Sequence, residues 1–160
     1  KPLGMAETSF FPGLEVLKRH PRYSQRIAGS SKEEVKAAIS KFRIKLDRFV
    51  SSSGGLVSNS NDLVKFFRLH SLRGKANGKQ LISPNVISRL HQNQPGSRGY
   101  GLGFKLFSNE IVGHGGASGT SGIVDLKHDR VVVILTQAGS KNARPLTRGG
   151  RRLALEILSE

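Results

Sequence analysis

The sequence predicts an α+β fold in which an antiparallel sheet is flanked by helices. Four short segments in the second half of the chain are apolar or alternate apolar with polar residues, as strands do: residues 100–107, 112–117, 120–125 and 131–136. Residues 127–130 form a short turn between the last two, which suits antiparallel neighbours. Segments with apolar residues at helical spacing lie before and after this block, so helices should accompany the sheet.

The first fifty residues give weaker signals. Residues 3–11 form an apolar opening that Pro12-Gly13 closes as a turn, and residues 15–29 are basic and irregular. Ser31 and Glu34 have the spacing of a capping box, which predicts a helix over residues 32–49. The last part of that segment also alternates as a strand would, so a strand at its end stays open.

A second helix is expected after a flexible break at residues 51–55. Asn61-Asp62 should cap it, since short polar side chains satisfy the free amides of a first turn. Its apolar stripe comprises Leu63, Phe66, Phe67 and, as a further candidate, His70.

A third helix should follow a turn-rich basic loop at residues 74–78. Ser83 has the character of an N-cap and Pro84 suits the first helical position, where its missing N–H costs nothing. This helix should end near Gln92 and bury the apolar residues Val86, Ile87 and Leu90.

The chain should close with a helix that begins at Pro145. Four apolar residues are expected to face the sheet: Leu146, Leu153, Ile157 and Leu158. Four arginines are expected to face outward: Arg144, Arg148, Arg151 and Arg152. Gly149-Gly150 lowers helix stability and suggests a place of close packing.

Length and charge set the broad class of the protein. The 160 residues fit a single domain over 1–160, in which residues 14–50 are the poorly placed part. The net charge is +15, yet residues 99–140 carry three basic and three acidic side chains, so the excess lies on the helices and loops. Binding to nucleic acid or another anionic polymer is therefore an alternative, but a solvated basic surface is favoured because aromatic residues are not interleaved with the cations.

Several kinds of chemistry are disfavoured by the residues present. The sequence has no cysteine, no apolar run that could span a membrane and no recognisable signal peptide, which leaves the compartment undecided. The five histidines lack metal-ligand spacing, and no cofactor-binding motif occurs, so neither metal nor cofactor is expected. Asp125 and Asp129 flank a turn and should be solvated, and Ser118 and Ser121 lack a motif that would make them nucleophiles.

The most informative segment is the glycine-rich run over residues 113–120, which joins two strands and contains His114. Glycine lets the backbone approach a small ligand closely, and free N–H groups at a sheet edge can point at that ligand. One interpretation is therefore a binding site in which His114 donates a proton or a hydrogen bond. The other is a tight bend in which His114 is satisfied by the backbone, and the residues alone leave both open.

A resemblance to a known family favours the first interpretation. The chain resembles the serine β-lactamase-related hydrolases, which include class C β-lactamases, D-alanyl-D-alanine carboxypeptidases, penicillin-binding-protein-like peptidases and related esterases. The resemblance rests on four segments in the family's order: Pro2-Leu3-Gly4-Met5 with Thr8 and Phe10, Gly54-Gly55-Leu56-Val57-Ser58 with Asn61-Asp62-Leu63 and Phe66, Gly99-Tyr100-Gly101-Leu102-Gly103-Phe104, and Gly113-His114-Gly115-Gly116.

The resemblance implies an acyl-enzyme reaction on an amide, β-lactam or ester. His114 would stand where a lysine or histidine of the family's third motif holds or protonates the substrate. Gly115 and Gly116 would keep the face of that strand open. The N–H of Ala117 would form half of the oxyanion hole, and the nucleophilic serine would supply the other half.

The sequence departs from the family pattern at two motifs. No serine is followed three residues later by lysine, so the S-x-x-K nucleophile motif is absent, and Y-x-N is absent as well. We therefore expect the chain to be the C-terminal portion of such a hydrolase and to be inactive alone. The alternative is a relative that keeps the fold as a non-catalytic binding or scaffold module.

The apolar strand at residues 131–136 completes the expectations. In the family, N-terminal strands pair beside this strand and pack with the C-terminal helix. A bare apolar edge invites pairing with another chain. We expect this edge to be covered by an N-terminal portion, by a second copy or by rearrangement.

Overall fold

The computed structural model describes residues 2–10, 55–116, 119–136 and 139–157, together with the single positions Pro12, Val16, Arg19, Ser31 and Ala37. The helix predicted over residues 32–49 therefore lies outside the described residues, apart from Ala37. The chain divides into two compact units, Ala6–Asn59 on one hand and Lys1–Met5 with Ser60–Glu160 on the other.

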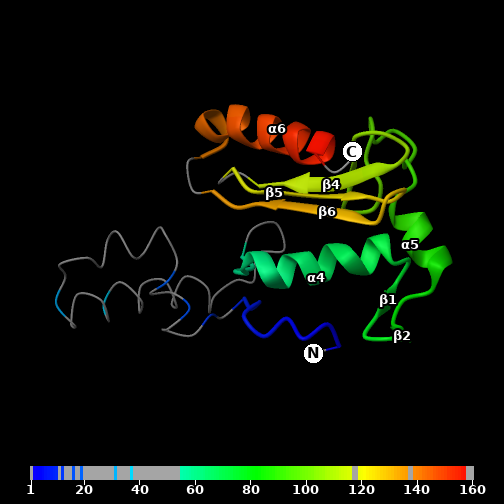
Figure 1. Ribbon diagram of the computed structural model, residues 1–160, viewed down its shortest axis with the longest axis horizontal. Helices are drawn as coiled ribbons and strands as arrows, with labels where there is room; N and C mark the ends of the chain where they lie inside the picture. Colours follow the sequence, from blue (N-terminus) through cyan, green and yellow to red (C-terminus); the bar gives the residue numbers. More distant parts are fainter. Residues whose placement is uncertain are drawn as a thin grey trace. The chain divides into compact units, whose positions relative to one another are not determined.

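The larger unit is built around a four-stranded antiparallel sheet with the order β3-β4-β5-β6. Its strands are β3 (Lys105–Leu106), β4 (Ile111–Gly115), β5 (Ser121–Asp125) and β6 (Arg130–Ile134). Helix α4 (Ser60–Ser71) and helix α6 (Gly139–Ile157) lie on opposite sides of the sheet (Figure 1). The predicted α+β class with an antiparallel sheet is confirmed.

Helix α4 packs on the sheet through Phe67, which lies over Gly122 of strand β5. A Cβ atom at Gly122 would come within 2.0 Å of the Phe67 ring, so only glycine fits at this point. Phe67 forms the core with Phe104, Val112 and Val124, and the predicted stripe of α4 points toward this cluster. Helix α4 begins at Ser60, so Asn61 and Asp62 lie inside its first turn and not before it.

Strands β5 and β6 differ in their burial. All five residues of β5 are buried, because β5 has a strand on each side and a helix on each face. All five residues of β6 are only half-buried, and Leu135 just beyond it is exposed. Within the described residues β6 is thus the last strand of the sheet, with one edge unpaired.

Helix α6 corrects two expectations. It begins at Gly139, six residues before Pro145, and it turns a different face toward the sheet. Leu146 and Leu153 are 60% and 56% exposed, whereas Thr147 is buried. Gly150 lies against Ile134 of β6, where a Cβ atom would be 3.1 Å from the Ile134 side chain. Small residues on this face allow the close approach that the bulkier leucines would prevent.

The strand predicted over residues 100–107 is much shorter in the structure. Only β3 is regular, and Tyr100 forms an isolated bridge with Lys105. Between them the chain folds back, with Gly103 in the left-handed region at φ 83° and the Gly101 amide donating to the Phe104 carbonyl. Leu102 is exposed, so apolar alternation here reflects a tight turn and not a continuous strand.

Helix α5 (Pro84–Leu90) has the predicted cap, because the Ser83 hydroxyl accepts a hydrogen bond from the Val86 amide at 3.4 Å. It ends two residues before Gln92. Ile87 is buried as expected, but Val86 is exposed. The prediction for Val86 was wrong because a two-turn helix can bury only a narrow stripe.

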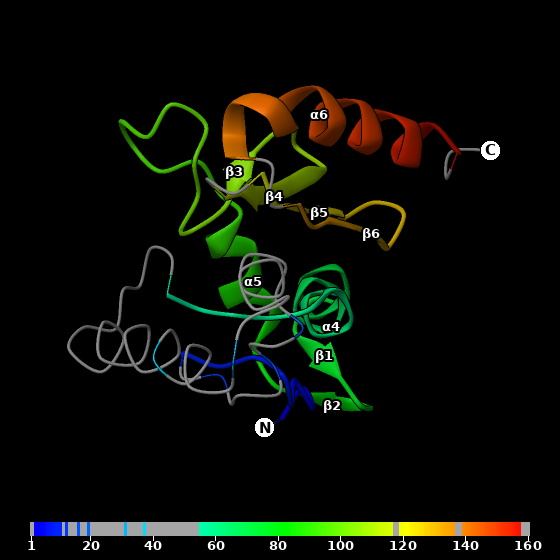
Figure 2. The same ribbon diagram turned by 90° about the vertical axis from the view of Figure 1, so that its left-hand side faces the viewer.

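A short hairpin precedes α5 and was not predicted. Strands β1 (Lys75–Ala76) and β2 (Lys79–Gln80) pair in antiparallel fashion (Figure 2). Asn77 and Gly78 connect them with φ values of 50° and 72°. Positive φ at both central residues is the geometry of a type I′ turn, for which Asn-Gly is the strongest sequence signal.

In the smaller unit, two of the segments that carry the family resemblance pair with each other. The Ser9 amide donates to the Val57 carbonyl at 3.0 Å, and the Val57 amide donates back at 2.9 Å. The hydroxyls of Thr8 and Ser58 lie 2.8 Å apart, and Asn59 donates to the Glu7 carboxylate. Sequence motifs fifty residues apart thus form one local structure.

A buried histidine pair joins α4 to the end of α5. His70 Nδ1 lies 3.1 Å from His91 Nε2, and both rings pack against Phe104. His70 is only 3% exposed. Burial, and secondarily the proximity of His91, lowers the pKa of His70 to about 4, and burial also lowers the pKa of His91. Both rings are therefore neutral at physiological pH.

We predict that Gly122→Ala destabilises the fold while Gly149→Ala does not. The new methyl group at position 122 collides with Phe67, and overpacking of this kind costs about 2 kcal/mol or more in the free energy of unfolding. Gly149 is an exposed helical glycine with nothing within 4 Å of an added Cβ, so the same change should stabilise by about 0.5–1 kcal/mol. Urea unfolding measures both values, and equal effects would contradict the packing described here.

We also predict that stability falls on mild acidification. The folded state keeps His70 neutral down to about pH 4, whereas an unfolded chain protonates it near pH 6.5. Between these values the unfolded state binds the extra proton, so the free energy of unfolding falls by up to about 1.4 kcal/mol per pH unit. His70→Gln should flatten this slope in urea unfolding measured across the same range. An unchanged slope would exclude His70 as its source.

Candidate functional site

The glycine-rich run forms the exposed end of strand β4 and the turn after it. Strand β3 pairs only with Val112 and Gly113, so β4 continues past its neighbour through His114 and Gly115. The Gly116 amide donates to the Thr120 carbonyl at 2.9 Å, which closes the turn into β5. Among the described residues, no strand pairs with this side of β4 at His114 and Gly115.

His114 is held in a defined orientation at this edge. Its Nδ1 lies 2.7 Å from the Gly115 carbonyl oxygen. A carbonyl can only accept, so Nδ1 carries the proton and, in the neutral ring, Nε2 keeps a free lone pair. The Tyr100 ring meets the imidazole edge to face, with centroids 6.0 Å apart and an interplanar angle of 61°. His114 is exposed, so Nε2 is open to a ligand.

His114 and Ser121 lie on opposite faces of the sheet. His114 pairs with Gly122, and Gly115 pairs with Ser121. Side chains alternate along a strand, and Val112 and Val124 belong to the core on the α4 side. His114 therefore shares the α4 face, while Ser121 shares the α6 face. This arrangement excludes a hydrogen bond between them and agrees with the expectation that Ser121 is no triad partner.

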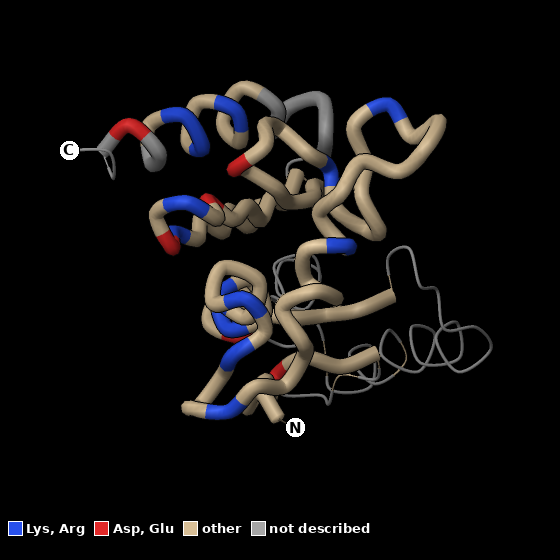
Figure 3. The backbone as a smooth tube through the Cα atoms, turned by 90° about the vertical axis from the view of Figure 1, so that its right-hand side faces the viewer, with Lys and Arg blue, Asp and Glu red and all other residues tan. Residues whose placement is uncertain are grey.

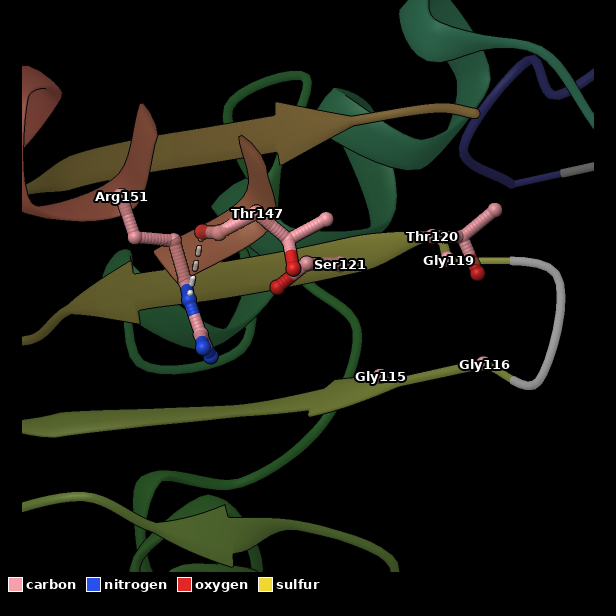
Figure 4. Close-up of a pocket in the computed structure, with 7 residues that line it drawn as sticks. All are labelled: Gly115, Gly116, Gly119, Thr120, Ser121, Thr147 and Arg151. Atoms are coloured by element: carbon pink, nitrogen blue, oxygen red, sulfur yellow. Dashed lines mark hydrogen bonds between the residues drawn. The ribbon is translucent and has the colours of Figure 1, made fainter. Parts of the chain in front are cut away.

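A cavity of about 160 Å³ lies on the α6 side of the same strand end (Figure 4). Its lining combines three glycines with four polar side chains: Gly115, Gly116, Gly119, Thr120, Ser121, Thr147 and Arg151. Ser121 is 5% exposed, and its hydroxyl has no hydrogen-bond partner among the described residues. A buried hydroxyl without a partner is costly, so it marks a place where a polar ligand or water would be stabilised.

Arg151 provides the positive charge of this cavity. Its Nε donates to the Thr147 carbonyl at 3.0 Å, and its guanidinium lies 4.9 Å from the centre of the Phe107 ring. Burial, and then the nearby charge of Arg148, lowers the pKa of Arg151, which nonetheless stays protonated at neutral pH. The prediction that Arg151 faces outward was wrong, because α6 presents its Thr147–Arg151 face to the sheet.

The remaining predicted site residues are Gly115, Gly116 and Ala117. Gly115 contributes to both the strand edge and the cavity. Gly116 contributes to the cavity, but its amide is used in the turn and is not available to a ligand. Ala117, the predicted oxyanion donor, lies outside the described residues. Thr147 and Arg151 were not predicted as site residues, because nothing in their local sequence distinguishes them from solvated positions.

Asp125 and Asp129 have separate roles. Asp125 is buried, and its carboxylate accepts from the amides of Lys127 and His128 at 3.1 Å and from His128 Nδ1 at 2.9 Å. Burial alone would raise the pKa of Asp125, but these hydrogen bonds lower it overall. The expectation of two solvated turn carboxylates was therefore wrong for Asp125, which stabilises the β5–β6 turn.

Neither a metal centre nor a membrane span emerges from the described ranges. No three His, Cys, Asp or Glu side chains gather there in a way that could hold a metal ion. None of the helices in this part of the chain combines the length and apolar character needed to cross a bilayer.

These features define a class of protein: an α+β domain with an exposed histidine at the glycine-rich end of an inner strand and a polar cavity behind that strand end. The chain belongs to the Beta-lactamase family, which matches residues 1–156. The resemblance seen in the sequence motifs is thereby confirmed at the level of the family.

A solved structure supports the same fold. The chain is similar to a protein from Bacteroides dorei DSM 17855, described provisionally as a beta-lactamase, with a TM-score of 0.51 and 13% sequence identity. The match covers 69% of this chain and 45% of the other, so the chain spans less than half of that structure. A search of curated proteins found no match.

We predict that neutral His114 carries its proton on Nδ1. Long-range ¹H–¹⁵N spectra distinguish the two ring nitrogens, and Nε2 should show the shift of an unprotonated nitrogen. His128 is the internal control, because its Nδ1 bond to the Asp125 carboxylate requires the same tautomer. A protonated Nε2 at His114 with an unprotonated Nδ1 would contradict the bond to Gly115.

Proposed function

We propose that this chain forms one wall of a serine hydrolase active site, which acts through an acyl-enzyme on an amide, β-lactam or ester. The observation that carries the proposal is the exposed His114, fixed by the Gly115 carbonyl at a strand end beyond the residues that pair with β3. Membership of the Beta-lactamase family supports this class of reaction.

In this proposal His114 acts through Nε2. Because Nδ1 is held by the Gly115 carbonyl, neutral His114 presents an acceptor toward the substrate, and protonated His114 presents a donor at the same place. It can therefore hold the substrate through a hydrogen bond or give a proton to it. The Tyr100 ring lies edge to face beside the imidazole. The N–H of Ala117 would stabilise the negative charge that develops on the attacked carbonyl oxygen.

The cavity behind β4 would bind a polar substituent of the substrate. Arg151 supplies a positive charge, and the Ser121 hydroxyl supplies a hydrogen bond that no protein group satisfies among the described residues. Both groups lie beside Gly115, so a substrate along the strand edge can reach them.

In this proposal the nucleophile lies outside these 160 residues, because no S-x-x-K occurs among them. The chain would then act together with a segment that carries that motif. A non-catalytic binding module is the alternative, and the coding sequence upstream of Lys1 discriminates the two. S-x-x-K followed by Y-x-N there supports the enzyme, whereas their absence supports the binding module.

We predict that the 160-residue chain turns over neither a chromogenic β-lactam nor a short-chain nitrophenyl ester. Turnover of either substrate would refute the assignment of the nucleophile to another segment. In the protein that carries S-x-x-K, His114→Gln should lower kcat by about 100-fold, as expected for loss of a proton-transfer group. Arg89→Gln, at an exposed position on α5, is the matched control and should leave kcat unchanged.

The unpaired edge of β6 and the outer face of α6 would bind that second segment or a second copy. Leu146 and Leu153 are exposed on a face of α6 that does not pack on the sheet. Gly149 lies between them, and a Cβ atom added there would have no neighbour within 4 Å. Leu135 adds an exposed apolar residue at the end of β6. A strand edge next to a helix with an exposed apolar stripe is the surface that a further strand and helix would cover.

We predict that the isolated chain self-associates and that Leu153→Lys weakens this association. Light scattering over a concentration series measures the mass. Leu102→Lys changes a similarly exposed leucine in the turn before β3 and serves as the control. A chain that stays monomeric at high concentration, with the β6 amides exchanging freely with solvent, would contradict the proposed covering of this edge.

A further inference from the structure

Helix α4 has a second face, distinct from the stripe that packs in the core. Lys65, Arg68 and Leu69 lie on it at the spacing i, i+3 and i+4, and Leu72, the residue after the end of the helix, follows at i+7. The core stripe begins two residues earlier, at Leu63, and runs through His70 at the same spacing. The two faces therefore point in different directions, and the second is available for a separate role.

The N-terminal segment and the β1 strand close over this second face. Lys65 Nζ donates to the Gly4 carbonyl at 2.8 Å, and Asn77 Nδ2 donates to the Pro2 carbonyl at 3.1 Å. These two bonds hold Leu3 above α4. A cavity of about 190 Å³, partly open to solvent, lies beside them, and its apolar lining includes Leu3, Leu69 and Leu72. It shares no residue with the cavity beside Gly115.

Three cationic side chains also line this cavity: Lys65, Arg68 and Lys75. Lys65 is paired with Asp62 at 3.2 Å, and Arg68 lies 3.9 Å from Asp129, which is a weak pair between half-exposed groups. Lys75 makes no ion pair within the described part of the chain, and no carboxylate lines the cavity. Basic positions recur along α4 and the following hairpin (Figure 3), so the local charge is positive.

We propose that this cavity binds a small organic anion with an apolar body, such as an aryl or short alkyl carboxylate or phosphate. The cavity has a volume of about 190 Å³, is partly open to solvent, and combines leucine side chains with cations in one lining. The leucines would contact the apolar body. Lys75 would bind the anionic group, and Arg68 can turn from its weak pair to join it. The site is independent of the proposed hydrolase function.

Titration of the ¹⁵N-labelled 160-residue chain with benzoate, followed by ¹H–¹⁵N spectra, tests the proposal. Saturable shifts should centre on the amides of Leu72, Lys75 and Ala76. Benzyl alcohol, which has the same ring without the charge, should bind about tenfold more weakly or not at all. Phenyl phosphate, titrated in parallel, shows whether carboxylate or phosphate is the preferred anionic group.

Two variants localise the charge. Lys75→Met should weaken benzoate binding about tenfold, because the ammonium without an ion pair is lost. Lys79→Met changes a lysine of the same hairpin that does not line the cavity, and it should have little effect. Equal weakening by both variants, equal binding of benzyl alcohol, or shifts that centre on Ser121 and Arg151 would each overturn the proposal. Unchanged amide spectra of the free variants, apart from the substituted region, verify that they are folded.

Discussion

The packing of Phe67 on Gly122 is the constraint on which the larger unit depends. The absence of a side chain at Gly122 brings α4 close to the sheet, and the same glycine pairs directly with His114 across β4 and β5. Gly122 therefore determines both how closely α4 packs on the sheet and which residue pairs with His114. A bulkier residue there would displace α4 and disturb the strand pair that presents the imidazole.

Most of this architecture could be predicted where local pattern and tertiary packing agree. Strands β4, β5 and β6 have the apolar character that buried strands require, and α4 has a stripe that matches its buried face. The predictions failed where packing overrode pattern. Gly103 folds the segment after Tyr100 back on itself, and small residues draw the Thr147–Gly150 face of α6 to β6, which leaves two leucines outside.

The two halves of the candidate site differ in how visible they are in the sequence. His114 and Gly115 were found because a histidine in a glycine-rich run between strands is an unusual local pattern. Thr147 and Arg151 come from a helix thirty residues later, and only the fold brings them behind β4. Arginine is common at exposed helical positions, so the local sequence does not indicate that Arg151 packs against Phe107. A site residue whose surroundings are set only by the tertiary fold cannot be predicted from its local sequence.

The histidine pair between α4 and α5 has one consequence for proton positions. His70 Nδ1 and His91 Nε2 face each other, so only one of these two nitrogens can carry a proton while the rings are neutral. A proton on His70 Nδ1 requires His91 to hold its own on Nδ1, and a proton on His91 Nε2 requires His70 to hold its own on Nε2. The tautomer of a residue on α4 and that of the residue after α5 thus change together, and each ring reports the state of the other.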